Sequence, residues 1–244
     1  MRGAGKDPVR LKTGRGRTAS SARWLARQLA DPYVRQAKAD GWRSRAAFKL
    51  LELDEKFHLL KGVHRVVDLG IAPGGWSQVV RKRIPAASVV GIDLLPTEAI
   101  EGVTIFELDF MADAAPALLV EALGGPPDLV VSDMAANTVG HKQTDHLRTM
   151  GLVEAAAHFA IEQLATGGAF VSKVLAGGTD AELLVLLKRH FTTVKHAKPP
   201  SSRKDVAALA WIAFCEIDSG SRQFVKSLFG LYPVKARIAR FVEL

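Results

Sequence analysis

The sequence predicts an α/β fold in which helices cover both faces of a doubly wound, mostly parallel sheet of seven strands. Short apolar runs alternate with stretches of helical periodicity, which is typical of parallel strands joined by crossover helices. The segment RVVDLGIAPGGWSQ, Arg65–Gln78, runs from an apolar strand through a Gly/Pro-rich turn into a helix start. The turn-rich KPPSSRKD separates the last two apolar runs and is too short for a crossover helix, so we expect an antiparallel pair at one edge.

The individual elements follow from the spacing of apolar residues and from the capping and breaking residues between them. Three helices are expected first: about 22–30 behind Ser20 or Ser21, 32–41 after the break at Asp31-Pro32, and 44–57 behind a Ser44 cap. Strands are expected at 64–69, 88–93, 103–107, 127–132 and 168–174, with helices near 75–83, 113–123, 144–165 and 180–189. The edge pair occupies 191–197 and 207–216, and a tail over 218–244 is spaced for one amphipathic helix.

Length and composition predict one main domain with short appendages. With 244 residues, 48% of them hydrophobic, the chain can bury one substantial core, which we place at residues 25–217. No run of about 18 apolar residues is present, and the N-terminal stretch lacks the apolar centre of a secretory signal, so we expect a soluble protein. The single cysteine, Cys215, excludes a disulfide framework and fits a reducing compartment.

Residues 1–24 form a basic arm. They contain seven basic residues and one acidic residue, and so supply six of the eight net positive charges. A Gly/Ser-containing segment of this kind buries too little apolar surface to fold alone, whereas its arginines can neutralise phosphates. We expect a disordered arm that binds nucleic acid through residues such as Arg15, Arg17 and Arg23. A solubilising tail and an organellar transit peptide are the alternatives.

The turn after the first strand predicts a pocket for a cofactor without phosphates. The spacing of Gly70, Gly74 and Gly75 departs from the G-x-G-x-x-G of dinucleotide sites, and Pro73 lacks the N–H that a pyrophosphate would need. S-adenosylmethionine (SAM) is such a cofactor, and Asp68 stands where it can meet the positively charged amino-acid end. The alternative is a plain strand-to-helix turn whose glycines allow close packing.

Three further acidic residues follow the second, third and fourth strands. In an open α/β sheet the ligand lies at the carboxyl ends of the strands, so these are the positions to inspect. Asp93 stands where a carboxylate reaches ribose hydroxyls, Asp109 can accept from an adenine amino group, and Asp133 lies beside the expected sulfonium. Each alone is equally well explained as a cap or a solvated acid, but together with the glycine turn they predict a nucleoside pocket.

Two lysines stand out from their surroundings. Lys173 interrupts the apolar run AFVSKVL near its carboxyl end, where a charged side chain is costly unless it is paired or faces a cleft. Lys49 lies off the apolar stripe of its helix, and on the sequence alone a solvated surface lysine explains it better than a functional one. His141 and His146 lack the spacing of metal ligands, so no metal site is predicted.

At these residues the sequence resembles the FtsJ (RrmJ/RlmE) family of ribosomal RNA ribose 2′-O-methyltransferases. The likeness spans about residues 18–213 and is carried by SSARWL, DPYVRQA, GWRSRAAFKL, VVDLGIAPGGWSQ, GIDLLP, LDF, SDMAAN, TDHLR, VSKVL and KPPSSR. It implies a Rossmann-like, SAM-dependent methyltransferase fold with cofactor contacts at Gly74, Trp76, Asp93, Asp109 and Asp133. It also implies a Lys-Asp-Lys-Glu catalytic set, of which Lys49, Asp133 and Lys173 are present.

Two features depart from the family pattern. The family carries a glutamate in the final strand and an aromatic residue two positions later, whereas the register from KPPSSR places Ala208 and Ala210 there. Neither Asp205 nor Glu216 is an obvious substitute, and we expect impaired rather than abolished activity. Ala136 replaces the proline of the family's D-x-A-P-N loop, which we expect to loosen that loop.

The resemblance implies 2′-O-methylation of a uridine ribose in the A-loop of large-subunit (23S-type) rRNA by a monomeric enzyme of the bacterial cytoplasm. We assign Lys173 as the base that takes the hydroxyl proton, Asp133 as the group that orients it, and Lys49 as the cation that stabilises the developing oxyanion. Arg43, Arg45 and Lys49 are expected to hold RNA phosphates within the assembled or assembling subunit. The alternatives are a catalytically impaired RNA-binding assembly factor, a small-molecule methyltransferase and a mitochondrial location.

Overall fold

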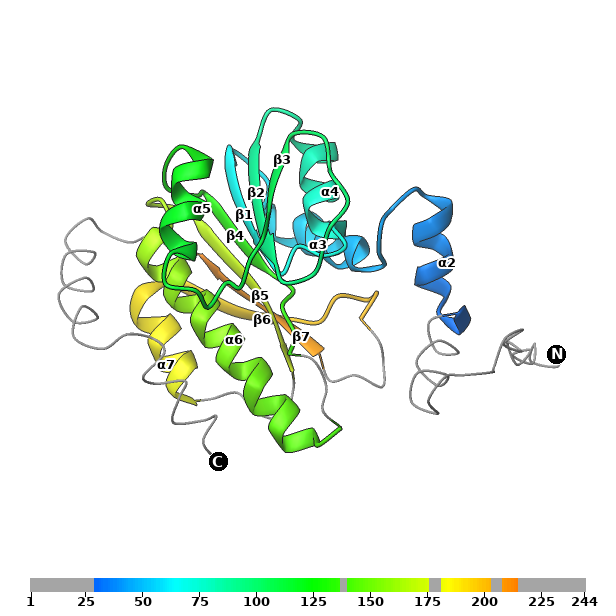
Figure 1. Cartoon of the computed structure of the whole chain (residues 1–244). Helices are drawn as coiled ribbons and strands as arrows, with labels where there is room; N and C mark the ends of the chain where they lie inside the picture. The colour runs from blue at the N-terminus through cyan, green and yellow to red at the C-terminus, as the bar shows by residue number, and fades with distance from the viewer. Residues whose placement is uncertain (1–28, 137–139, 176–180, 203–207, 215–244) are drawn as a thin grey trace.

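A seven-stranded sheet forms the centre of the computed structural model, which describes residues 29–136, 140–175, 181–202 and 208–214 (Figure 1). The strands are β1 Arg65–Leu69, β2 Ser88–Asp93, β3 Val103–Glu107, β4 Leu129–Ser132, β5 Ala169–Leu175, β6 Thr193–Ala197 and β7 Ala208–Phe214. Their order is β3-β2-β1-β4-β5-β7-β6. The first five in this order run parallel, and β7 is antiparallel to both β5 and β6. The predicted fold class is confirmed.

Helices cover both faces of this sheet. They are α2 Pro32–Ala39, α3 Ala46–Phe57, α4 Gly75–Arg83, α5 Ala115–Leu123, α6 Lys142–Gln163 and α7 Ala181–His190. One buried cluster joins the sheet to α3 and α4, and a second joins it to α5, α6 and α7. Figure 1 shows these two groups on opposite sides of the strands, with α2 beside α3 at the outside of the domain.

The central strand β1 shows why the strands are almost continuously apolar. Val66 belongs to the cluster under α3 and α4, whereas its neighbour Val67 and also Leu69 belong to the cluster under α5, α6 and α7. All three side chains are fully buried. A strand covered on both faces has no side exposed to solvent. Its sequence is therefore a continuous run of apolar residues rather than an alternation of apolar and polar residues.

The expected antiparallel pair, β6 and β7, is confirmed at one end of the sheet. The last strand in the sequence, β7, inserts between β5 and β6, so that β6 forms the edge. The expected arm over 1–24, residues 22–28 of the helix expected over about 22–30, and the tail over 218–244 lie outside the described residues. In the part of the chain that the structure describes, no helix is long and apolar enough to span a membrane.

Candidate active site

Acidic and basic side chains meet where the parallel strands end. The strands β1, β2, β4 and β5 run in the same direction, so their carboxyl ends share one edge of the sheet. Asp68 lies near the end of β1, and Asp93 is the last residue of β2. Asp133 directly follows β4, and Lys173 lies two residues before the end of β5. Sequence positions more than 100 residues apart thereby form one candidate site.

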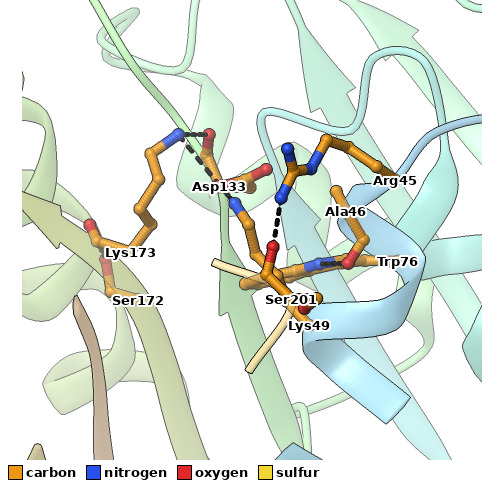
Figure 2. Close-up of polar contacts among 8 residues, drawn as sticks. All are labelled: Arg45, Ala46, Lys49, Trp76, Asp133, Ser172, Lys173 and Ser201. Carbon is orange, nitrogen blue, oxygen red and sulfur yellow. Dashed lines mark hydrogen bonds and ion pairs between the residues drawn. The ribbon is translucent and has the colours of Figure 1, made fainter. Parts of the chain in front are cut away.

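Asp133 brings Lys49 and Lys173 together (Figure 2). Lys173 Nζ lies 2.9 Å from Asp133 Oδ1 and donates to the main-chain oxygen of Asp133 at 2.5 Å. Lys49 Nζ lies 3.6 Å from the same Oδ1. The exposed fractions of the three side chains are 16 to 23%. Lys49 is therefore an ion-paired residue of this cluster and not a solvated surface lysine.

The charges of the two lysines keep Asp133 ionised. Burial alone would raise the pKa of this carboxyl, but the Coulombic attraction of Lys173 and then of Lys49 lowers the pKa below its ordinary value of 3.8. A carboxylate that stays charged at neutral pH can fix the position of both ammonium groups. The cluster thus carries two positive charges and one negative charge in a partly buried setting.

Helix α3 presents Lys49 to this cluster because its apolar residues face the other way. Ala47, Leu50 and Leu53 are buried at helical spacing, and the indole Nε1 of Trp76 in α4 donates to the main-chain oxygen of Ala46 at 2.8 Å. These contacts fix the rotation of α3 about its axis, so Lys49 points towards Asp133.

The predicted capping of α3 by Ser44 is wrong. The helix begins at Ala46, its N-cap is Arg45, and no side chain there makes a capping hydrogen bond. Ser44 Oγ instead lies against Gly75 at the start of α4, in space that a β-carbon on Gly75 would fill, and it has no hydrogen-bond partner among the described residues. The close packing of α3 against α4 draws the hydroxyl away from the capping position.

The glycine turn lies directly beside the Asp133 loop. Gly70 has a φ of +78°, and a β-carbon there would come within 2.6 Å of the Cγ of Met134, the residue after Asp133. Gly74 is the N-cap of α4 with a φ of +103°. Only glycine fits both the conformation and the space at these two positions. The predicted cofactor turn and the lysine cluster therefore belong to one region.

The side chain of Trp76, one of the predicted cofactor contacts, lies inside the core with 3% of its surface exposed. Its indole ring packs beneath the turn, and the indole N–H is already committed to α3. Any contact of this residue with a ligand at the turn would therefore come from its main chain.

Three of the predicted acidic residues hold turns at the same edge. Asp68 is 1% exposed and accepts from Ser77 Oγ at 2.6 Å at the start of α4; burial raises the pKa of this carboxyl to about 7. Asp93 accepts from the N–H of Ala72 in the glycine turn at 2.9 Å. Asp109 is exposed and accepts from the N–H of Met111 at 2.8 Å. These contacts order the turns around the predicted nucleoside pocket.

Two arginines that we expected to bind RNA phosphates are engaged within the chain. Arg43 donates to three main-chain oxygens near the glycine turn. Arg45 forms an ion pair with Asp31, donates to the main-chain oxygen of Ser201, and lies over the ring of Tyr33 (Figure 2 shows the Ser201 contact). The other predicted RNA contacts, Arg15, Arg17 and Arg23, lie outside the described residues.

His141, whose spacing from His146 does not fit metal ligands, caps a helix. Its ring accepts from the N–H of Thr144 and so satisfies one free donor at the start of α6. Among the described residues, no group of three or more His, Cys, Asp or Glu side chains is placed to hold a metal ion.

Comparison with known proteins identifies the family. The model of the FtsJ-like methyltransferase family matches residues 42–215 of this chain. This chain belongs to the FtsJ-like methyltransferase family. FtsJ-like methyltransferases are in general SAM-dependent enzymes.

The relatives of this FtsJ-like chain include two bacterial proteins named ribosomal RNA large subunit methyltransferase E. The protein from Novosphingobium aromaticivorans is 79% identical over 201 residues, 82% of this chain and 90% of the relative. That from Erythrobacter litoralis is 75% identical over 205 residues, 84% of this chain and 93% of the relative. A Plasmodium falciparum crystal structure described as a ribosomal RNA methyltransferase has a TM-score of 0.63 and 30% identity, covering 71% of this chain and 98% of that one.

The departures of this chain from the FtsJ pattern have structural counterparts. The N–H of Ala136, which a proline would lack, donates to Thr149 Oγ1 in α6 at 3.4 Å, and this contact ties the loop that we expected to be loosened. In the antiparallel ladder of β5 and β7, Ala210 pairs with Lys173 and Ala208 with Leu175. Position 208, where the family carries a glutamate, is therefore two residues along β7 from Ala210, the residue that pairs with Lys173. Asp205 and Glu216 lie outside the described residues.

Sequence reasoning missed Glu52, which the structure ties to Ser201. Glu52 lies on α3 one turn after Lys49, and its carboxylate accepts hydrogen bonds from Ser201. A glutamate in an amphipathic helix normally signals only a solvated face, so no local pattern distinguishes this one. Ser201 lies in KPPSSR, a segment that carries the family likeness, whereas Glu52 lies two residues beyond GWRSRAAFKL, so the likeness does not mark it.

Proposed function

We propose that this protein methylates the 2′-hydroxyl of a ribose in large-subunit rRNA, with SAM as the methyl donor and a uridine of the A-loop as the target. The observation that carries the proposal is the convergence of Lys49 and Lys173 on Asp133 beside the glycine turn. The names of the bacterial relatives supply the substrate class. The charged residues of the cluster supply the chemistry that a hydroxyl nucleophile requires.

The residues at the turn fit a nucleoside cofactor with an amino-acid end. Gly70 and Gly74 let the turn pack tightly against Met134 and Ile100, where a β-carbon would collide, and Ser44 Oγ is a buried hydroxyl at the start of α4 with no hydrogen-bond partner among the described residues. Asp93 orders the turn and is assigned to the ribose hydroxyls. Asp68 is buried beneath the turn with a raised pKa, and the ammonium group of a bound cofactor would favour its ionised form. SAM, when bound, supplies an activated methyl group.

Each member of the cluster has a distinct role in the proposed reaction. A neutral ribose hydroxyl is a poor nucleophile, so its proton must be removed while oxygen, carbon and sulfur are held in line. The uncharged amine of Lys173 accepts this proton and becomes the ammonium, and Asp133 holds Nζ in place through its carboxylate and its main-chain oxygen. A sulfonium nearby favours the uncharged amine that accepts a proton. Lys49 stabilises the negative charge that develops on the ribose oxygen.

Methyl transfer from radiolabelled SAM to undermodified large ribosomal subunits tests this function. We expect label at a ribose of the large-subunit rRNA, and we expect Lys173→Ala to abolish it while SAM binding is retained. Residues 1–24 should contribute to RNA binding through Arg15, Arg17 and Arg23. Transfer to a small molecule that is independent of this arm would instead support a small-molecule methyltransferase.

The second candidate function is that of a catalytically impaired relative that binds RNA as an assembly factor in the bacterial cytoplasm. The specific observation in its favour is alanine at position 208, paired with Leu175 where the family carries a glutamate. SAM binding without methyl transfer to any large-subunit substrate would favour this function. Transfer abolished by Lys173→Ala would exclude it.

A further inference from the structure

Arg43 links three segments around the glycine turn. Its guanidinium donates to the main-chain oxygens of Glu98 and Ala99, both at 2.6 Å, and to that of Pro73 at 3.4 Å. The first two acceptors lie in residues 94–100, here called the 94–100 loop, which follows β2 and Asp93. A planar guanidinium can serve several oxygens at once in a fixed geometry, which an ammonium cannot.

The base of this arginine is itself fixed. The N–H of Arg43 donates to Gln78 Oε1 at 2.9 Å, and Gln78 Nε2 donates to the main-chain oxygen of Gly41 at 2.8 Å. The segment before α3 is thereby held to α4. The side chain of Arg43 then passes over Gly74, where a β-carbon would lie 3.4 Å from Arg43 Cδ and 2.5 Å from the Cδ1 of Ile100.

Arg43 supplies the hydrogen bonds that attach the 94–100 loop to the glycine turn, next to the packing of Ile100 over Gly74. Within the described part of the chain, no other hydrogen bond joins residues 94–99 to a segment distant in sequence; the remaining bonds run to Asp93 and within the loop itself. Leu94 and Leu95 expose 63% and 59% of their surfaces, so apolar burial of these side chains does not hold the loop either.

We propose that Arg43 fastens the 94–100 loop to the glycine turn and thereby positions the residues that bind the cofactor. RNA binding is not its main role. This inference rests on the proposed SAM site. The loop directly follows Asp93, which orders the turn and is assigned to the cofactor ribose. If the loop is loosened, Asp93 is held less firmly in the position from which it would bind the ribose. The guanidinium makes its bonds to uncharged carbonyls, and an RNA phosphate would have to compete with three of them.

The test separates the affinity for the cofactor from the affinity for RNA in the full chain. Arg43→Ala and Arg43→Lys are compared with wild type by calorimetric titration of SAM and of S-adenosylhomocysteine, and by binding of a short A-loop RNA hairpin. We expect the Kd for both cofactor forms to rise roughly tenfold, the equivalent of about 1.4 kcal/mol. The Kd for the RNA should change less than about twofold. In turnover, KM for SAM should rise while KM for RNA stays constant.

Arg43→Lys is the decisive variant because it keeps the charge and loses the planar bridge. If Arg43 acts on the cofactor site, lysine fails to restore the SAM affinity; if it binds phosphate by charge, lysine behaves as wild type, and the inference is overturned. Arg35→Ala is the matched control, since Arg35 is an exposed arginine of α2 for which no loop contact is present. Its SAM affinity should equal that of wild type.

Hydrogen exchange of the apo protein gives a readout that does not involve the cofactor. Amides of residues 94–100 should exchange faster in Arg43→Ala and Arg43→Lys than in wild type, with little change in the core strands. Wild-type protein that binds no SAM would overturn the proposed function. Wild-type protein that binds SAM as tightly as Arg43→Ala would overturn this inference alone.

Discussion

The carboxylate of Glu52 holds Ser201, which lies 149 residues further along the chain. The backbone N–H of Ser201 lies 3.1 and 3.0 Å from the two carboxylate oxygens, and its hydroxyl donates to Oε2 at 2.6 Å. This contact fastens the connection after β6 to α3, the helix that carries Lys49. Figure 2 shows the main-chain oxygen of Ser201 in contact with Arg45, the N-cap residue of α3. The position of α3, which carries the proposed catalytic Lys49, therefore depends on the segment between β6 and β7.

Loss of the Glu52 carboxylate is expected to destabilise the protein. Glu52→Gln removes the negative charge and turns an N–H donor towards Ser201, so we expect the free energy of unfolding to fall by about 1–3 kcal/mol. Ser201→Ala is the matched variant, because it removes only the hydroxyl bond and keeps the backbone bonds; it should cost about 1 kcal/mol. Urea unfolding of both variants measures this, and equal losses would show that the backbone bonds contribute nothing.

Asp68 is expected to make the protein less stable as the pH rises towards neutrality. Burial, partly offset by Ser77, raises the pKa of this carboxyl from 3.8 to about 7. A raised pKa in the folded state means that the folded protein binds the proton more tightly, so this contribution to stability is fully present below pH 3.8 and is lost as the pH approaches 7. The loss should reach at most about 1.4 kcal/mol per pH unit.

Asp68→Asn is the variant that isolates this group, because an amide mimics the protonated carboxyl without titrating. Urea unfolding of wild type and variant at about pH 5 and pH 8 gives the difference in stability at each pH. We expect wild type to lose stability relative to the variant at the higher pH. A difference that stays constant with pH would contradict the assignment.

Asp133 should show the opposite pH dependence. The attraction of Lys173 and Lys49 outweighs burial and lowers the pKa of Asp133, so its contribution to stability is present above the ordinary value of 3.8 and is lost as the pH falls through the lowered pKa. Asp133→Asn leaves the two ammonium groups facing each other without an anion. We expect it to be less stable than wild type at pH 7 by about 1–3 kcal/mol, with the gap closing in acid. Thermal unfolding of both proteins at several pH values measures this difference in stability. A difference that does not change with pH would contradict the prediction.

Restoring the family glutamate is expected to raise activity. Position 208 pairs with Leu175, one ladder step from Lys173, so a carboxylate introduced there by Ala208→Glu can reach the region of the cluster. Because a misplacement of about 1 Å can cost roughly a hundredfold in rate, we expect kcat to rise about tenfold. The matched variant is Ala213→Glu, placed in the same strand opposite Phe170 and far from the cluster. Equal rates for wild type and Ala208→Glu would remove any role for the missing carboxylate.

Local patterns predicted the elements of this fold closely because each element depends on neighbouring residues. Strand β2 at Ser88–Asp93 and helix α4 at Gly75–Arg83 lie where the apolar spacing placed them. Helix α6 begins at Lys142, two residues before its expected start, because His141 caps it. The cap assigned to Ser44 failed because the packing of α3 on α4, which is not a local property, determines where that hydroxyl lies.

The sequence by itself determined the fold class, the family likeness, the glycine turn and the chemical types of Lys49, Asp133 and Lys173. These depend on periodicity, turn chemistry and residue identity, which are legible along the chain. The tertiary structure alone decided that the two lysines share one oxygen of Asp133, that β7 lies inside the sheet edge, and that Arg43 is committed to the 94–100 loop. Ion pairs and hydrogen bonds between segments so far apart in the chain follow from how helices and strands pack, and no local pattern encodes that packing.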